Sequence, residues 1–214
     1  MSRLLRQILS ILVVALLAVL LFYASYLPMR KAQLYIRGLS STSLIRSWDD
    51  FTGTFNPGLS APAPYGQDEL LKNFGGSIIT SLIDSAAKEQ PIVAKAATNY
   101  YMQYAAPLLE RERGVSFVQL VQSSASVFHH AYVMTSDETY ALETEKLYKY
   151  GLTLSPDRAQ FVYGLFDIYR DMHRYNEAYP LGLKILDLWA DPRIALYLSK
   201  FPPQAIEGVT SNKK

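Results

Sequence analysis

The stretch FVYGLFDIYRDMHRYNEAYPLGLKILDLWADP, Phe161–Pro192, decides the fold of this chain. One apolar face, at the i, i+3, i+4 and i+7 spacing of an α-helix, consists of Val162, Leu165, Phe166 and Tyr169. A polar turn follows at His173. The second half carries Ala178, Ile185 and Trp189 on one side of another helix. The pattern therefore predicts two helices that pack on each other as a hairpin.

This hairpin has the features of a repeat unit. Pro156 and Pro192 stand 36 residues apart, close to the period of about 34 residues of tetratricopeptide repeats. RYNEAYPLGLKILDLWADP resembles the second helix of such a repeat, with Tyr175 and Ala178 at its aromatic and small positions, and FVYGLFDIY resembles the first. TEKLYKYGLTLSPD resembles the end of a preceding repeat. The match departs from the family at Val162, often tryptophan there, at Phe166, often small, and at Pro180, which predicts a kink or a late helix start.

The tetratricopeptide resemblance implies that one set of side chains packs the helices together and another set binds a partner. The residues that would pack the helices together are Val162, Leu165, Phe166, Tyr169, Tyr175, Ala178 and Ile185. The residues that would line a groove for a protein partner are Gln160, Tyr163, Asp167, Arg170 and Asp171. Because a free-standing array normally has at least about three repeats, the preceding helices are expected to cap this one.

Two helix starts are predicted from capping signals. Thr135 stands three residues before Glu138, which is the spacing of a capping box. Further on, Ser155 is placed to cap the next helix, with Pro156 at its first position and Asp157 in its first turn. These signals bound a repeat-like region over residues 135–201.

The N-terminal segment is predicted to be a membrane anchor. ILSILVVALLAVLLFYASYL, Ile8–Leu27, contains no charge, and a helix of about 20 residues spans the roughly 30 Å hydrocarbon core of a bilayer. A cleaved signal peptide is the alternative, but its apolar region is usually shorter and a small-residue cleavage site follows it. Basic residues flank both ends of the segment, so sidedness rests on the usual arrangement of a short N-terminal tail, with the domain outside the cytoplasm.

The chain is predicted to be all-α, with a single N-terminal transmembrane helix. We expect an anchor over residues 1–30 and a helical region over 67–134, where apolar residues recur at helical spacing. Residues 31–66 are expected to be a juxtamembrane helix broken at Gly38 and Ser40–Ser43, followed by a loop rich in proline and glycine from Thr52 to Gly66. Residues 202–214 are expected to be a flexible tail.

Composition excludes several kinds of chemistry. The 21 basic and 19 acidic residues nearly cancel, which argues against nucleic acid as a partner. Cysteine is absent, so disulfides and thiolate ligands are excluded. His129 and His130 are adjacent and point about 100° apart on a helix, unlike the i, i+4 pair of a metal site. We therefore expect no metal, no cofactor and no catalysis. An enzyme whose site combines Trp48–Asp50 with the histidines is the alternative.

A second resemblance concerns the whole arrangement. A span, a loop such as APAPYGQDELLKNF, and helices that contain LSPDRAQFVYGLFDIYRDMHRYNEA are similar to the C-terminal tail of bacterial O-antigen ligase or polymerase-like membrane proteins. With one span, the chain would correspond to a detached tail, a paralogue or a fragment of such a protein. The resemblance implies a membrane-anchored scaffold whose protein partner serves cell-envelope polysaccharide assembly. A secreted helical protein remains a further alternative.

Overall fold

The computed structural model describes residues 3–86 and 91–203, and these ranges contain helices and turns but no strand. The predicted all-helical class is confirmed. The chain forms two compact units, Met1–Leu71 and Lys72–Lys214, with the boundary inside helix α4 (Gln67–Asn73). Most of the expected tail at residues 202–214 lies outside the described residues.

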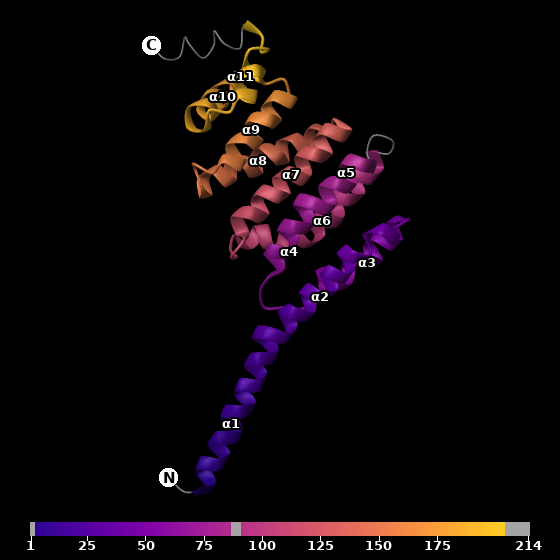
Figure 1. The fold of residues 1–214 in the computed structure, drawn as a ribbon, viewed down its shortest axis with the longest axis vertical. Helices are drawn as coiled ribbons and strands as arrows, with labels where there is room; N and C mark the ends of the chain where they lie inside the picture. The colour runs from indigo at the N-terminus through magenta and orange to yellow at the C-terminus, as the bar shows by residue number, and fades with distance from the viewer. Residues whose placement is uncertain (1–2, 87–90, 204–214) are drawn as a thin grey trace. The chain divides into compact units, whose positions relative to one another are not determined.

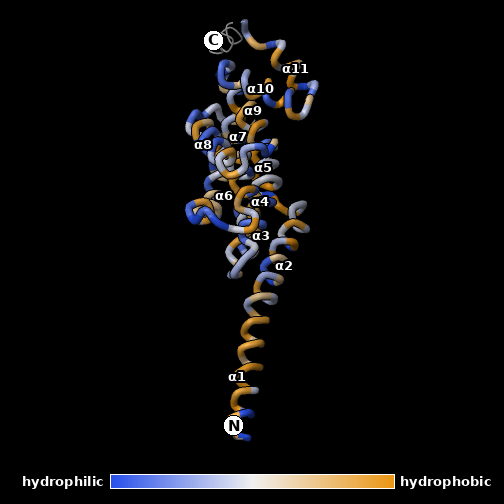
Figure 2. The backbone as a smooth tube through the Cα atoms, turned by 90° about the vertical axis from the view of Figure 1, so that its left-hand side faces the viewer, coloured by the Kyte–Doolittle hydropathy of each residue, from blue (hydrophilic) through white to orange (hydrophobic). Residues whose placement is uncertain are grey.

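The first unit begins with one long apolar helix. α1 (Arg3–Leu21), a π-helical turn η1 (Phe22–Tyr26) and α2 (Leu27–Ser40) run on without a break for 38 residues. Beyond its hydrophilic first turns, α1 is mostly hydrophobic in Figure 2, and its most apolar window has no residue buried in the protein. This helix is long and apolar enough to cross a membrane. It shares those two properties with a signal sequence.

The predicted loop from Thr52 is wrong over its first half. After a short 3₁₀ turn η2 (Thr42–Leu44), helix α3 spans Trp48–Ser60 and includes Pro57. Proline costs this helix a hydrogen bond, but α3 packs along α2 with Phe51, Phe55 and Leu59 buried. The free energy gained by burying these three side chains outweighs the local preference of proline and glycine for a loop. Only the segment from 61 to 66 has no helix.

Glycines bring α2 and α3 close together. A Cβ atom on Gly58 would lie 2.9 Å from the backbone of Tyr35, so the two helices could not approach as they do with a larger residue. A Cβ atom on Gly38 would lie 3.1 Å from the backbone oxygen of Thr54 and 3.3 Å from the ring of Phe55, which is a tight contact rather than an overlap. Helix α2 continues through Gly38 and ends at Ser40, so the predicted break is wrong at Gly38 but the helix does end within the predicted Ser40–Ser43 cluster. Lys31 completes the junction: its ammonium donates to the backbone oxygens of Leu59 and Ala61 at the C-terminal end of α3.

The second unit is a stack of antiparallel helices (Figure 1). Its elements are η3 (Phe74–Ile79, π-helical), α5 (Thr80–Ala86), α6 (Pro91–Arg111), α7 (Phe117–Thr135), α8 (Glu138–Leu154), α9 (Ala159–Asp171), α10 (Tyr175–Trp189) and α11 (Pro192–Leu198). Each helix from α5 on packs on the next one, and α7 also contacts both α5 and α9. Alternate helices α5, α7 and α9 thus lie side by side.

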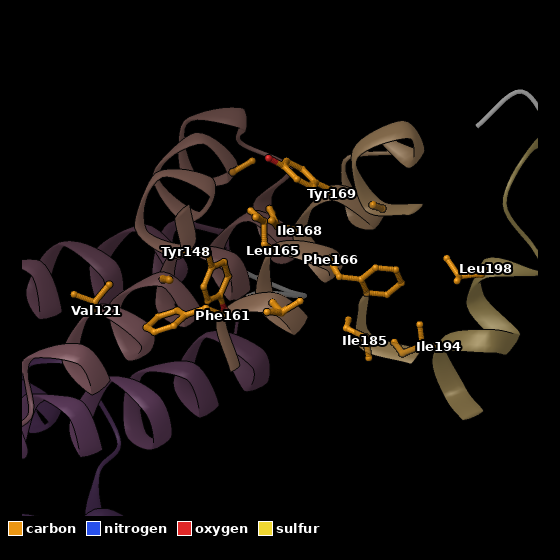
Figure 3. Packing of buried hydrophobic residues seen from close by; sticks show 14 of the residues in the cluster. Val121, Tyr148, Phe161, Leu165, Phe166, Ile168, Tyr169, Ile185, Ile194 and Leu198 are labelled. Atoms are coloured by element: carbon orange, nitrogen blue, oxygen red, sulfur yellow. The ribbon is translucent and has the colours of Figure 1, made fainter. Parts of the chain in front are cut away.

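The hairpin predicted from Phe161–Pro192 is present as α9 and α10. Helix α9 lies at the centre of the main apolar cluster (Figure 3), and its residues Phe161, Val162, Phe166 and Ile168 are fully buried. Ala178 and Ile185 of α10 are also fully buried, whereas Tyr175 is half-buried and Trp189 is 37% exposed. Despite Pro180, α10 begins at Tyr175, so the late start that proline suggested does not occur.

A reciprocal contact of rings with glycines fixes α8 against α9. The ring of Phe161 on α9 covers Gly151 on α8, and the ring of Tyr148 on α8 covers Gly164 on α9. A Cβ atom would lie 2.2 Å from a ring carbon at Gly151 and 2.3 Å from one at Gly164. The two rings meet edge to face, with centroids 6.5 Å apart. Each glycine is therefore required by the ring that lies on it.

Both predicted helix caps are wrong by a few residues. Thr135 ends α7, where its hydroxyl donates to the backbone oxygen of Ala131, and Asp137 caps α8 by accepting from the Thr139 N–H at 2.9 Å. Helix α9 begins at Ala159 after Arg158, because Ser155–Arg158 forms a turn closed by a backbone hydrogen bond. A neighbouring residue can accept hydrogen bonds from the same unpaired N–H groups at the helix start. Local spacing therefore does not determine which residue caps the helix.

Glu145 joins three helices of this stack. Its carboxylate, 12% exposed, accepts hydrogen bonds from Tyr169 of α9 and from Arg174 at the start of α10, and it pairs with Lys149 on its own helix. The Arg174 guanidinium also lies 4.5 Å from the centroid of the Tyr169 ring. Burial alone would raise the pKa of Glu145, but the hydrogen bonds from Arg174, Lys149 and Tyr169 lower it to about 2.

Substitution Gly164→Ala is expected to destabilise the second unit. Alanine favours a helix over glycine by about 1 kcal/mol, but overpacking a core costs about 1–3 kcal/mol, and the overlap with Tyr148 is severe. We expect a net loss of roughly 1–2 kcal/mol, measured by unfolding of the full chain in detergent. Gly76→Ala is the control, because its Cβ would meet only Ser123 at 3.7 Å. Equal stabilities for the two variants would contradict this packing.

The Glu145 contacts predict a dependence of stability on pH. Because the pKa of Glu145 is about 2 when folded and 4.5 as its reference value, its contribution is complete above about pH 5 and disappears as pH falls through about 2. Glu145→Gln should therefore unfold more easily than wild type at pH 7, by on the order of 2 kcal/mol. The difference in unfolding free energy should shrink steadily between about pH 5 and pH 2. A difference that stays constant over that range would show that Glu145 does not act through its charge.

Candidate functional site

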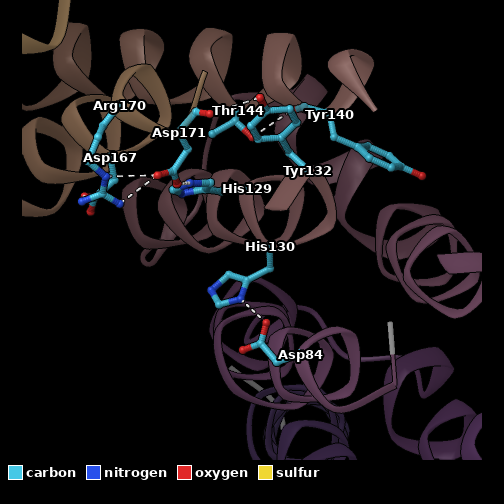
Figure 4. A network of polar contacts seen from close by, with 9 residues as sticks. All are labelled: Asp84, His129, His130, Tyr132, Tyr140, Thr144, Asp167, Arg170 and Asp171. Carbon is cyan, nitrogen blue, oxygen red and sulfur yellow. Dashed lines mark hydrogen bonds and ion pairs between the residues drawn. The ribbon is translucent and has the colours of Figure 1, made fainter. Parts of the chain in front are cut away.

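A line of polar contacts connects α5, α7, α9 and α11. The adjacent histidines of α7 reach in opposite directions: His130 Nδ1 lies 2.6 Å from Asp84 Oδ1 on α5, and His129 Nε2 lies 2.8 Å from Asp171 Oδ2 on α9 (Figure 4). Each imidazole donates to a carboxylate of a different neighbour. The angle of about 100° between consecutive helical side chains is what allows this.

Arg170 extends the line along α9 and on to α11. Its guanidinium pairs with Asp167 at 2.7 Å and with Asp171 at 2.9 Å. It also lies over the ring of Tyr197 on α11, 4.8 Å from the centroid. We call the resulting surface the ladder face, which consists of Asp84, His130, His129, Asp171, Arg170, Asp167 and Tyr197. Its side chains are between 15% and 45% exposed in the ion pairs, so they are held in place and yet reach solvent.

The two carboxylates of α9 differ in their electrostatic surroundings. Burial would raise the pKa of Asp171, but the hydrogen bond from His129 and the charge of Arg170 outweigh it and lower that pKa. Burial raises the pKa of Asp167, and Arg170 offsets this only in part. Asp171 therefore serves to fix the histidine and arginine. The charge of Asp167 is stabilised less by its neighbours within the protein. A cationic or hydrogen-bonding group of a partner would therefore stabilise that charge.

The predicted groove residues do not all come together. Asp167, Arg170 and Asp171 form one cluster on the ladder face. Tyr163 lies toward α11, where its hydroxyl donates to Asp191 Oδ2 at 3.0 Å and its ring lies 5.7 Å from that of Trp189. Gln160, at the start of α9, is exposed and accepts from Arg158. All five side chains lie off the buried side of α9. Together they form a strip that is charged in one part and aromatic in another.

Sequence reasoning missed several members of the ladder face. Asp84 and Tyr197 were not singled out, because each lies far along the chain from its partner, and Trp189 was expected only on the packing side of its helix. His129 and His130 were weighed as metal ligands and as part of the alternative enzymatic site, and not as links between helices. The signal that could have identified their role was the adjacency itself, since two neighbouring helical side chains can reach two different helices.

The residues of the alternative enzymatic site have local structural roles. Ser47 caps α3 by accepting from the Asp50 N–H at 3.0 Å, and Asp50 accepts from the Arg46 N–H at 3.1 Å. His173, at φ 59° in the turn before α10, has its Nδ1 2.8 Å from the Tyr175 hydroxyl. Among the described residues, no group of three or more histidine, aspartate or glutamate side chains is placed to hold a metal ion.

Comparison with known proteins gives no relative for this chain: no protein-family model, curated protein or solved structure matches it.

Proposed function

We propose that this chain is a membrane-anchored scaffold that binds another protein through the ladder face and the adjoining strip at Tyr163. The observation that carries this proposal is the preformed order of half-exposed polar and charged side chains on α5, α7 and α9, with the ring of Tyr197 on α11 beside Arg170. Side chains held by their neighbours lose little entropy when a partner binds, which favours affinity. Binding of this kind requires neither a cofactor nor catalysis by the chain.

The proposed architecture of the second unit is a tetratricopeptide-like array. The antiparallel hairpins α7–α8 and α9–α10 support it, as does the fully buried Ala178 where α9 and α10 pack together. In such an array the first helices of successive hairpins share one face. That geometry agrees with the contacts of α7 with α5 and α9, and it makes the ladder face the natural docking surface.

The apolar helix Arg3–Ser40 is the proposed anchor. Support comes from the chain that follows this helix and returns to it near the end of its apolar part: Tyr65 donates to the backbone oxygen of Ala24, and Lys31 of the helix donates to the Leu59 oxygen at the end of α3. A signal peptidase would have to cut within this structure. We place the second unit outside the cytoplasm. Tethering beside the bilayer would raise its effective concentration for a membrane partner, and by sequence resemblance a polysaccharide ligase or polymerase is the first candidate.

Site-specific photo-crosslinking tests this function. A photoreactive phenylalanine analogue replaces Tyr163 or Gln160 in the full chain, and captured proteins are identified by mass spectrometry from native membranes. The control position is Leu142, which is 59% exposed on α8 and lies outside the ladder face. We expect the same partner from both α9 positions and not from Leu142, and less capture when Arg170→Glu reverses the charge at the centre of the face.

Equal capture from Leu142, or no capture above background from a folded protein at either α9 position, would contradict docking at this face.

A further inference from the structure

A concave surface lies in the same unit, away from the ladder face. Helices α6 and α8 both pack along α7, but they make little contact with each other. The space between them is a groove of about 400 Å³. Phe128 of α7 forms part of its floor and is 9% exposed. The groove, here called the α6–α8 groove, is not used by the function proposed above.

The walls of this groove are apolar and repeat with the period of a helix. Met102, Ala106 and Leu109 of α6 line one side, and Leu147 and Tyr150 of α8 line the other. The α6 residues are spaced at i, i+4 and i+7, so the wall is about two helical turns long, roughly 12 Å. All five are half-buried. A surface of this length and character fits the apolar side of a helix, which anchors in grooves by side chains at i, i+3 or i+4, and i+7.

The rim of the groove is acidic. Glu110 and Glu112 lie at one end, beside the C-terminus of α6, and Glu143 lies on α8 with one basic residue, Lys146, 3.4 Å away. Three carboxylates against one ammonium give the lining a net charge of −2. The partial negative charge of the α6 C-terminus adds to it. Arg111 and Arg113 belong to the same segment but are not among the residues that line the groove.

We propose that the α6–α8 groove binds a basic amphipathic helix of a partner protein. The apolar side of that helix would cover Phe128 and the two walls, and its lysine or arginine residues would face Glu110, Glu112 and Glu143. Charge complementarity of this kind selects among partners and speeds their association more than it adds affinity. The partner is thus defined by its chemistry: an apolar stripe flanked by positive charge.

Disulfide trapping tests the proposal, because the chain has no cysteine of its own. Ala106→Cys places one thiol in the groove of the full chain, in nanodiscs of zwitterionic lipid. Gln103→Cys, exposed on the same helix outside the groove, is the matched control. The probes are a synthetic Leu/Lys amphipathic helix with one cysteine on its apolar side, activated as a mixed disulfide so that attack by the groove thiolate releases the small thiol, and a Leu/Glu helix of the same design. Circular dichroism verifies that both variants are folded.

We expect the Leu/Lys helix to be trapped at Ala106→Cys at least about tenfold faster than at Gln103→Cys, a difference of about 1.4 kcal/mol. Glu110→Lys with Glu143→Lys should remove that preference, whereas Glu138→Lys, outside the groove, should not. Equal trapping at both cysteines would overturn the site. Equal trapping of the Leu/Glu helix would overturn the basic partner. Efficient dimerisation of the Ala106→Cys chain without peptide would make a second copy the occupant and also overturn the proposal.

Discussion

The reciprocal packing of Tyr148 on Gly164 and Phe161 on Gly151 is the contact on which the second unit depends. It brings the backbones of α8 and α9 closer than larger side chains would permit. With α8 fixed on one side and α10 on the other, α9 buries Phe161, Val162, Leu165, Phe166, Ile168 and Tyr169. Only a narrow strip of the α9 surface therefore remains exposed to solvent. The polar residues of α9 must therefore lie on that strip, next to the exposed side of α7.

The ladder face follows from this constraint. Because α7 and α9 are adjacent, His129 can reach Asp171, and because the next residue of α7 points elsewhere, His130 can reach Asp84 on α5. The Glu145 contacts connect α8, α9 and α10 by a separate set of charges. Apolar packing thus determines the order of the helices, and ion pairs determine how the exposed side chains are held. The α6–α8 groove arises from the same order, since α6 and α8 are separated by α7.

Much of the fold could be predicted from local sequence patterns. The apolar period of Phe161–Trp189 predicts the α9–α10 hairpin, and the uncharged run Ile8–Leu27 predicts the long N-terminal helix. The errors arise where distant contacts decide the outcome. Pro57 and Gly58 are loop signals locally, but packing on Tyr35 turns them into a helix. Half of the candidate site could not be predicted from the sequence for the same reason. His129 and Asp171 are 42 positions apart, and no local spacing relates them.

Cysteine accessibility along α9 tests whether this helix is buried on all but one strip. The rate of labelling by a charged maleimide is compared for Gln160→Cys and Val162→Cys in the full chain in membranes. The chain has no native cysteine that would add a background signal. The account predicts rapid labelling of the cysteine at position 160, and labelling of that at position 162 only after denaturation, because Val162 is fully buried and Gln160 is exposed. Similar rates at the two positions in the folded protein would contradict it.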